Sequence, residues 1–175
     1  AQHLDMEPWD ILLGGGDVTS AVDVSAAIDH ALSFGNGLYG VINNAAIGPL
    51  GTVLDTEPDM FSRILEVNLK GPYQMCRAAV PHMAKRGGGR IVNVGSGAGW
   101  GKPNMAAYSA SKGGLVALSA AMALDHFADG IAVNTVIPGG GGIVSGMSLG
   151  RVSGDQERLR GNAVGTVAGR IMNGQ

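Results

Sequence analysis

The 175-residue chain has only one cysteine, Cys76, which excludes an intrachain disulfide and a metal site built from cysteines. This cysteine usage favours a reducing compartment, and we expect a cytoplasmic protein. The apolar runs all fall short of the 18 or so residues that a membrane-spanning helix requires, so no membrane partner is expected. Lysine and arginine (12) nearly balance aspartate and glutamate (14), and no basic run favours a nucleic-acid partner.

Glycine, by contrast, is abundant, with 30 of the 175 residues where about 7% is the ordinary share. The glycines gather between segments of regular apolar spacing, which is typical of loops in a folded protein. The run at 14–16 lacks a third glycine at the spacing of a phosphate-binding loop. We therefore interpret this run as the turn that follows a strand.

Short apolar segments alternate with helical ones along the chain. Strands are predicted at 11–13, 40–46, 90–94 and 131–137, and helices at 20–32, 58–85 and 105–127. Gly71 and Pro72 are expected to kink or briefly break the second helix. The alternation predicts an α/β fold with a parallel sheet and helices on both faces. Because no repeat or linker interrupts the pattern, residues 1–175 are expected to form a single domain.

The most informative stretch places a phenol and an ammonium group four residues apart, at Tyr108 and Lys112. On a helix, residues at this spacing lie on the same face. A lysine beside a tyrosine favours the phenolate and so lowers a pKa that is about 10 without such a neighbour. A hydroxyl group adjusted in this way suits general acid–base catalysis between an alcohol and a carbonyl. Taken alone, such a pair is more often two simple neighbours on a helix.

Polar or glycine-rich residues follow the predicted strands. In a parallel sheet, ligands bind at the carboxyl ends of the strands. We therefore expect the ends of the four strands to converge on one site: Gly16 and Asp17, Asn43 and Asn44, Ser96, and Pro138 and Gly139.

Six segments, in order, resemble those of the short-chain dehydrogenase/reductase family. They lie at 16–19, 43–46, 67–69, 91–96, 108–112 and 133–139. One such segment would be weak support for the resemblance, but six segments at family-like spacing are strong support. The resemblance implies a doubly wound sheet of the Rossmann type and an oxidoreductase that interconverts a secondary alcohol and a ketone with NAD or NADP.

The resemblance also implies a role for each of four catalytic residues. Tyr108 would exchange a proton with the substrate oxygen, and Lys112 would lower the pKa of Tyr108 and bind the nicotinamide ribose. Ser96 would hydrogen-bond the substrate oxygen and stabilise the charge that develops on it. Asn68 would help to hold a water molecule in a proton relay to Lys112.

The cofactor would contact a further set of residues. Asp17 would meet the adenine with Val18 beside it, Asn44 and Ala45 would line the adenosine side, and Pro138 and Gly139 would approach the nicotinamide. Tyr108 and Lys112 complete this set.

Plainer interpretations remain open for several of these residues. Asn68 and Asn43 are also typical of structural amides, and Asp17 of a helix cap or a turn residue. The loop at 139–142 is either a flexible connection or a lid over the substrate. No metal site is predicted, because the four histidines (positions 3, 30, 82 and 126) have no ligand spacing.

The family's first strand, its glycine-rich turn and the next helix and strand have no counterpart in this sequence. We therefore expect an incomplete Rossmann-type domain that lacks the first β-α-β unit, from a truncated or partly recorded chain. The alternative function is a non-catalytic fragment or pseudoenzyme that serves as an association module. In either case we expect a homo-oligomer, a dimer or tetramer, formed through the two long helices. Their expected contact faces are Met75, Ala78, Ala79 and Met83, and Ala117, Ala120, Ala121 and Leu124.

Overall fold

The computed structural model describes residues 13–34, 37–138, 143–144, 146–155, 157 and 172–173. Three of the sequence predictions fall partly or wholly elsewhere. Residues 11 and 12 of the first predicted strand lie outside the described residues, and so do Gly139 and the whole loop at 139–142.

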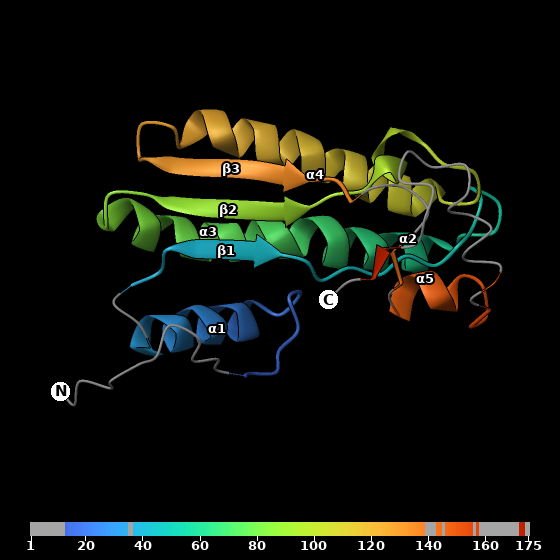
Figure 1. Cartoon of the computed structure of the whole chain (residues 1–175), viewed down its shortest axis with the longest axis horizontal. Helices are drawn as coiled ribbons and strands as arrows, with labels where there is room; N and C mark the ends of the chain where they lie inside the picture. Colours follow the sequence, from blue (N-terminus) through green and yellow to red (C-terminus); the bar gives the residue numbers. More distant parts are fainter. Residues whose placement is uncertain are drawn as a thin grey trace.

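Three strands form a parallel sheet in the order β1-β2-β3 (Figure 1): β1 (Gly40–Asn43), β2 (Gly89–Val94) and β3 (Ile131–Val136). Val41 lies opposite Ile91, and Ile91 lies opposite Val133. All three side chains are buried, because alternate residues of a strand point to the same face of the sheet. β1 ends three residues earlier than predicted. A short parallel pair, β4 (Ile143–Val144) and β5 (Met172–Asn173), lies apart from this sheet.

The helices begin and end close to their predicted positions. Ser20 caps the first one, since its side chain accepts a hydrogen bond from the Asp23 N–H at 3.2 Å. The helices are α1 (Ala21–Phe34), α2 (Pro58–Leu65), the π-helix η1 (Glu66–Lys70), α3 (Gly71–Lys85), the 3-10 helix η2 (Gly97–Trp100), α4 (Ala106–Asp125) and α5 (Gly146–Gly150).

The expected break at Gly71 and Pro72 takes the form of a wide turn. Pro72 has no N–H, and in a regular helix its ring would crowd the carbonyl group four residues earlier. The π-helix η1 comes directly before it, and the Gly71 N–H bonds to the carbonyl of Glu66, five residues back. The helical path therefore continues from Pro58 to Lys85. A π-turn of this kind is often found at functional sites, and it contains Asn68.

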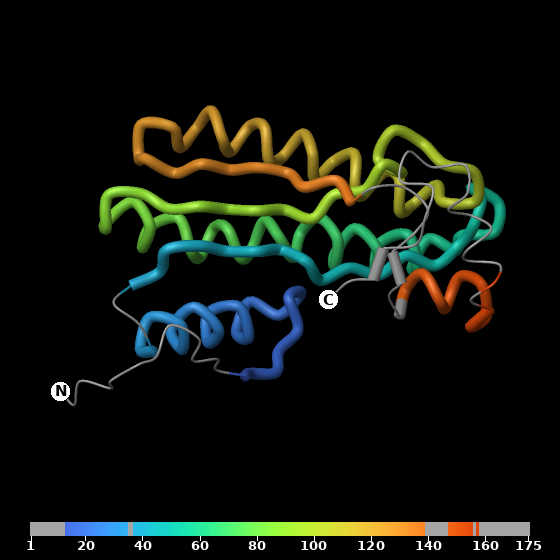
Figure 2. Tube along the Cα trace, viewed as in Figure 1, coloured from blue at the N-terminus to red at the C-terminus, as the bar shows by residue number. Residues whose placement is uncertain are grey.

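One apolar cluster joins the helices to the sheet. Its buried members come from α1, α3, α4, the three strands and Leu38: Ile28, Leu38, Val41, Cys76, Ala79, Met83, Ile91, Met122, Ile131 and Val133. All three helices therefore pack on the same face of the sheet. Figure 2 traces the path of the chain through these helices and strands. On the opposite face, Ile42 is 73% exposed and Val136 is 51% exposed. The α/β parallel fold is confirmed, but in the described part of the chain the main helices cover one face of the sheet and not both.

The predicted contact face of α3 is wrong. Ala79 and Met83 are fully buried in the cluster, and Met75 and Ala78 pack against it. Methionine and alanine fit a core as readily as an interface, so their spacing did not distinguish a core-facing side of the helix from an interface. The predicted contact face of α4, by contrast, is exposed: this holds for Ala117, Ala120 and Ala121, and Leu124 is 82% exposed.

Among the residues placed in the structure, no helix combines the length and apolarity needed to cross a membrane.

Candidate active site

Three of the four predicted strand ends meet at one edge of the sheet, whereas Gly16 and Asp17 follow no strand in the described part of the chain. The arrows of β1, β2 and β3 point the same way (Figure 1), so Asn44, Ser96 and Pro138 follow neighbouring strands on the same side. The Gly95 N–H donates to the carbonyl oxygen of Val136 at 2.8 Å and holds the last two strand ends together. This edge is where a ligand site is expected in a parallel sheet.

Tyr108 and Lys112 lie one turn apart in the first half of α4, and both are buried. The Lys112 ammonium group lies 5.9 Å from the centre of the Tyr108 ring and donates to the carbonyl oxygen of Val94 at 2.7 Å. That bond ties the helix to the end of β2. Burial disfavours the charged ammonium and lowers the pKa of Lys112 from 10.5 to about 8.

Ser96 begins the loop that packs against this turn of α4. Its hydroxyl oxygen caps η2 by accepting a hydrogen bond from the Ala98 N–H at 3.2 Å, and Ala98 packs against Tyr108. The loop approaches the helix where both carry glycine, because a Cβ on Gly113 would lie 2.9 Å from the carbonyl oxygen of Gly99. The structure thus brings the Ser96 loop, Tyr108 and Lys112 together.

Asn68 is fully buried, and its side chain holds two other segments. Its amide oxygen accepts from the Ile47 N–H at 2.8 Å, and its amide nitrogen donates to the Ile47 carbonyl at 2.8 Å and to the Ser111 hydroxyl at 3.0 Å. The Ser111 hydroxyl in turn donates to the Tyr108 carbonyl at 2.7 Å. Asn68 therefore links η1 to the loop after β1 and to the turn of α4 that carries Tyr108.

Asp17 and Val18 dock on the α2–α3 helical path. The Asp17 carboxylate accepts bonds from the Thr19 N–H and hydroxyl, each at 2.8 Å, and forms an ion pair with Arg63 at 3.2 Å. These hydrogen bonds, led by the one from the Thr19 backbone, lower the pKa of Asp17. The Val18 carbonyl accepts from Gln74 at 3.0 Å. This local turn is the plainer role that the sequence left open for Asp17.

Sequence reasoning missed a chain of side-chain hydrogen bonds beneath the site. Asn43 donates to the Asn93 amide oxygen at 2.8 Å, Asn93 donates to the Ser119 hydroxyl at 2.8 Å, and Ser119 donates to the Leu115 carbonyl at 2.7 Å. Asn43 also donates to the Cys76 sulfur at 3.4 Å. A structural role for Asn43 is confirmed, although side chains and not only backbone groups make the links.

Sequence reasoning also missed Arg151, which follows α5. Its guanidinium carbon lies 4.8 Å from the centre of the Tyr108 ring, and its Nε donates to the Gly48 carbonyl at 3.1 Å. A cavity of about 530 Å³ opens beside it. The cavity is lined by Ala46, Ile47, Gly48, Pro49, Leu50, Met147, Gly150 and Arg151. Arg151 and Gly48 are 103 positions apart, so no local motif joins them.

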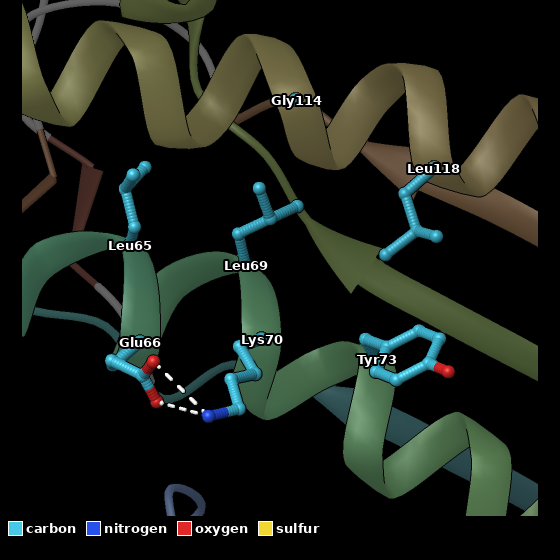
Figure 3. Close-up of a pocket in the computed structure, with 7 residues that line it drawn as sticks. All are labelled: Leu65, Glu66, Leu69, Lys70, Tyr73, Gly114 and Leu118. Carbon is cyan, nitrogen blue, oxygen red and sulfur yellow. Dashed lines mark hydrogen bonds and ion pairs between the residues drawn. The ribbon is translucent and has the colours of Figure 1, made fainter. Parts of the chain in front are cut away.

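A second cavity, of about 400 Å³, lies between the α2–α3 path and α4 on the outer side of the molecule (Figure 3). Leu65 and Leu69 project from the α2–α3 path toward α4. Leu69 lies opposite Gly114, and Leu118 points from α4 toward Tyr73. Glu66 and Lys70 form an ion pair at 2.9 Å along its rim. None of the predicted catalytic residues lines this cavity.

The family model described as "short chain dehydrogenase" matches residues 1–148. The chain belongs to the short-chain dehydrogenase family. Two relatives from Xanthobacter autotrophicus are similar to it. 2-(S)-Hydroxypropyl-CoM dehydrogenase 3 is 44% identical over 126 residues, which are 71% of this chain and 49% of the relative. Inactive 2-(S)-hydroxypropyl-CoM dehydrogenase 2 is 41% identical over 140 residues, 79% of this chain and 60% of the relative. The chain thus spans about half the length of these curated relatives.

Solved structures of two dehydrogenases share the fold. An NAD+-bound xylitol dehydrogenase has a TM-score of 0.72 and 35% identity, and the match covers 82% of this chain and 55% of that one. A gluconate 5-dehydrogenase from Burkholderia cenocepacia, solved with NADP and tartrate, has a TM-score of 0.78 and 28% identity, covering 90% and 61%. Both of these neighbours were solved with a nicotinamide cofactor.

Lys112, on α4 beside the end of β2, fits the nicotinamide-ribose part of such a cofactor. Lys112 is a buried ammonium with three donors, and the one hydrogen bond found for it, to Val94, leaves donors for ribose hydroxyls. Within the described ranges, no group of three histidine, cysteine, aspartate or glutamate side chains is arranged to hold a metal ion.

Proposed function

We propose that this short-chain dehydrogenase is an NAD(P)-dependent oxidoreductase that interconverts a secondary alcohol and a ketone. The observation that carries the proposal is the meeting of Tyr108, Lys112 and the Ser96 loop at the carboxyl edge of the sheet. The similar proteins are named as dehydrogenases of hydroxypropyl, xylitol and gluconate compounds. Those names support the alcohol–ketone class and no individual substrate.

In the proposed mechanism, the Tyr108 hydroxyl gives a proton to the ketone oxygen, or takes one from the alcohol. Lys112 lies beside the ring, with its ammonium group 5.9 Å from the ring centre, and its remaining N–H donors are placed to bind the nicotinamide ribose. The Ser96 hydroxyl donates to the substrate oxygen and stabilises the negative charge that develops there. When bound, the cofactor supplies or accepts the hydride.

We consider two roles for Asn68: it positions the segments around Tyr108, and it helps to hold a water molecule in a proton relay. Its bonds to Ile47 and Ser111 support a positioning role, because they fix the segments on either side of Tyr108. The predicted water relay from Asn68 to Lys112 remains a prediction.

The cofactor contacts of the other residues also remain predictions. They concern Asp17, Val18, Asn44, Ala45, Pro138 and Gly139. Asn44 and Ala45 are exposed at the strand edge, which supports their part in it.

Two measurements test this function. The first titrates the chain with NADH and NADPH and follows energy transfer from tryptophan to the reduced nicotinamide. The second screens alcohols and ketones with the wild type, Tyr108→Phe and Tyr73→Phe. We expect Tyr108→Phe to abolish turnover and retain cofactor binding, whereas Tyr73→Phe, on the exposed surface of α3, stays active. Near-wild-type turnover by Tyr108→Phe would contradict the mechanism.

The second candidate is a non-catalytic relative that serves as an association module. The name "inactive" of one close relative, at 41% identity, favours it. The presence of Ser96, Tyr108 and Lys112 argues against this candidate, because an association module does not need all three. A folded wild-type chain that binds neither NADH nor NADPH would support this candidate.

We further propose that the chain forms a homo-oligomer through its long helices. Gly114, Ala117, Leu118, Ala121 and Leu124 follow helical spacing along α4 and continue the outer cavity of Figure 3 as an apolar stripe. Light scattering of the wild type and of Ala121→Glu tests this, with a dimer or larger expected only for the wild type. A monomeric wild type would exclude it. A single domain over residues 1–175 and a cytoplasmic location remain predictions.

A further inference from the structure

The cavity beside Tyr108 contains a positive charge that the proposed mechanism does not use. Arg151 is half-buried and, among the described residues that line the cavity, is the only charged side chain, the others being alanine, isoleucine, glycine, proline, leucine and methionine. Among the residues that the structure describes, no carboxylate pairs with it. A charge withdrawn from water without a counterion is costly, so such a group is expected to meet an anion in the working state.

The surroundings of Arg151 hold its guanidinium in one place. It stacks on the Tyr108 ring at 4.8 Å, its Nε donates to the Gly48 carbonyl at 3.1 Å, and its Nη2 lies 3.3 Å from the Met147 sulfur. A side chain at Gly48 would overlap the guanidinium, so glycine is what allows this approach. These contacts occupy a minority of the five guanidinium N–H donors.

We propose that Arg151 binds an oxyanion group of the substrate, so that this short-chain dehydrogenase acts on small hydroxy acids and the corresponding oxo acids. The inference rests on the proposed function, which identifies the alcohol or ketone as the group that reacts. The planar guanidinium fork matches the two oxygens of a carboxylate, and a sulfonate offers similar oxygens. Because Arg151 lies against the ring whose hydroxyl exchanges the proton, the anion and the alcohol belong to one short molecule.

The test compares lactate with lactamide, which has the same carbon skeleton and alcohol but no charge. Binding is measured by calorimetry, without turnover, for the wild type, Arg151→Gln and Arg151→Lys. Losing a hydrogen bond between charged groups should raise the dissociation constant of lactate roughly 10- to 100-fold in Arg151→Gln. Lactamide should bind equally and weakly to all three proteins. Arg151→Lys should recover part of the affinity, and hydroxypropanesulfonate in place of lactate shows whether a sulfonate is also accepted.

Arg86→Gln is the matched control. Arg86 also stacks on a tyrosine, with its guanidinium carbon 5.2 Å from the centre of the Tyr39 ring, but it is exposed at the end of α3 and away from the cavity. Arg86→Gln removes the same charge and the same type of stacking contact as Arg151→Gln, and we expect no change in lactate binding.

The outcomes separate this inference from the proposed function. Lactate binding that depends on Arg151, without any turnover, supports the anion site and counts against the oxidoreductase proposal for this chain. Turnover of neutral alcohols with equal lactate and lactamide binding in wild type and Arg151→Gln overturns the anion site alone. A wild type that binds neither lactate nor hydroxypropanesulfonate also overturns it. If Arg151→Gln lowers kcat equally for charged and neutral alcohols and leaves KM unchanged, Arg151 acts on Tyr108 and not on the substrate, which again overturns the proposal.

Discussion

Replacing Lys112 by methionine should change how the free energy of unfolding depends on pH. Lys112 has a pKa of about 8 in the folded chain, against 10.5 without the fold, because burial disfavours its charge. Between these two pH values the unfolded chain binds more protons, so the free energy of unfolding rises with pH. At 1.36 kcal/mol for each pKa unit, the full rise is about 3 kcal/mol.

Cys76 opposes this rise at higher pH. Burial raises the pKa of its thiol from 9.0 to about 11. Between those values the folded chain binds more protons, and about 3 kcal/mol of unfolding free energy is lost. The wild type should therefore become more stable from pH 8 to pH 9 and change little from there to pH 10.5. Lys112→Met should lose stability above pH 9, whereas Cys76→Ala should keep gaining it up to pH 10.5.

Urea unfolding of the wild type and the two variants, repeated across this pH range, gives the required differences. The surface groups titrate alike in all three proteins, so they cancel when a variant is subtracted from the wild type. A wild type minus Lys112→Met difference that stays constant from pH 8 to pH 10.5 would refute the buried, low-pKa lysine. Lys112→Met also lacks the bond to Val94, but that loss shifts the difference equally at every pH.

Two further predictions concern the segments around Tyr108. Asn68→Ala removes the three hydrogen bonds of this buried side chain and should lower the free energy of unfolding by about 3 kcal/mol, measured with urea; an unchanged midpoint would exclude its hydrogen bonds to Ile47. Gly113→Ala should destabilise the chain and reduce cofactor binding, although alanine is the better helix former, because its methyl group would displace the Gly99 carbonyl and with it the Ser96 loop. A thermal melt at or above that of the wild type would contradict this close approach.

The sequence was sufficient for the elements and for part of the site, because both depend on local spacing. Tyr108 and Lys112 share a helix face through the four-residue repeat, and Ser96 lies near them because it ends a neighbouring parallel strand. Their spacing could be read directly from the chain. The helical path through Gly71 and Pro72 could be read only in part, since a proline predicts a disturbance but not whether a π-turn absorbs it.

The remaining features depend on contacts between distant segments. Arg151 reaches Tyr108 only after α5 packs beside the loop that contains Gly48, and neither segment carries a motif for the other. The orientation of α3 was wrong for a similar reason, since an alanine such as Ala79 suits a core and a surface equally well. The prediction of helices on both faces followed from the alternation of elements, which gives their order along the chain but not the face on which each one packs.

The hydrogen-bond chain of Asn43, Asn93 and Ser119 has a consequence for how the strands align. A shift of β2 by one residue would turn the Asn93 side chain to the opposite face of the sheet. Its link to β1 and its link to α4 would then be lost together, leaving the Asn43 amide and the Ser119 hydroxyl with fewer partners in the interior. The same shift would turn Ile91 out of the apolar core, so this buried polar chain adds to a penalty that the core already imposes. Since β2 leads to Ser96 and α4 carries Tyr108, the alignment of the strands also determines where the Ser96 and Tyr108 hydroxyl groups lie relative to one another.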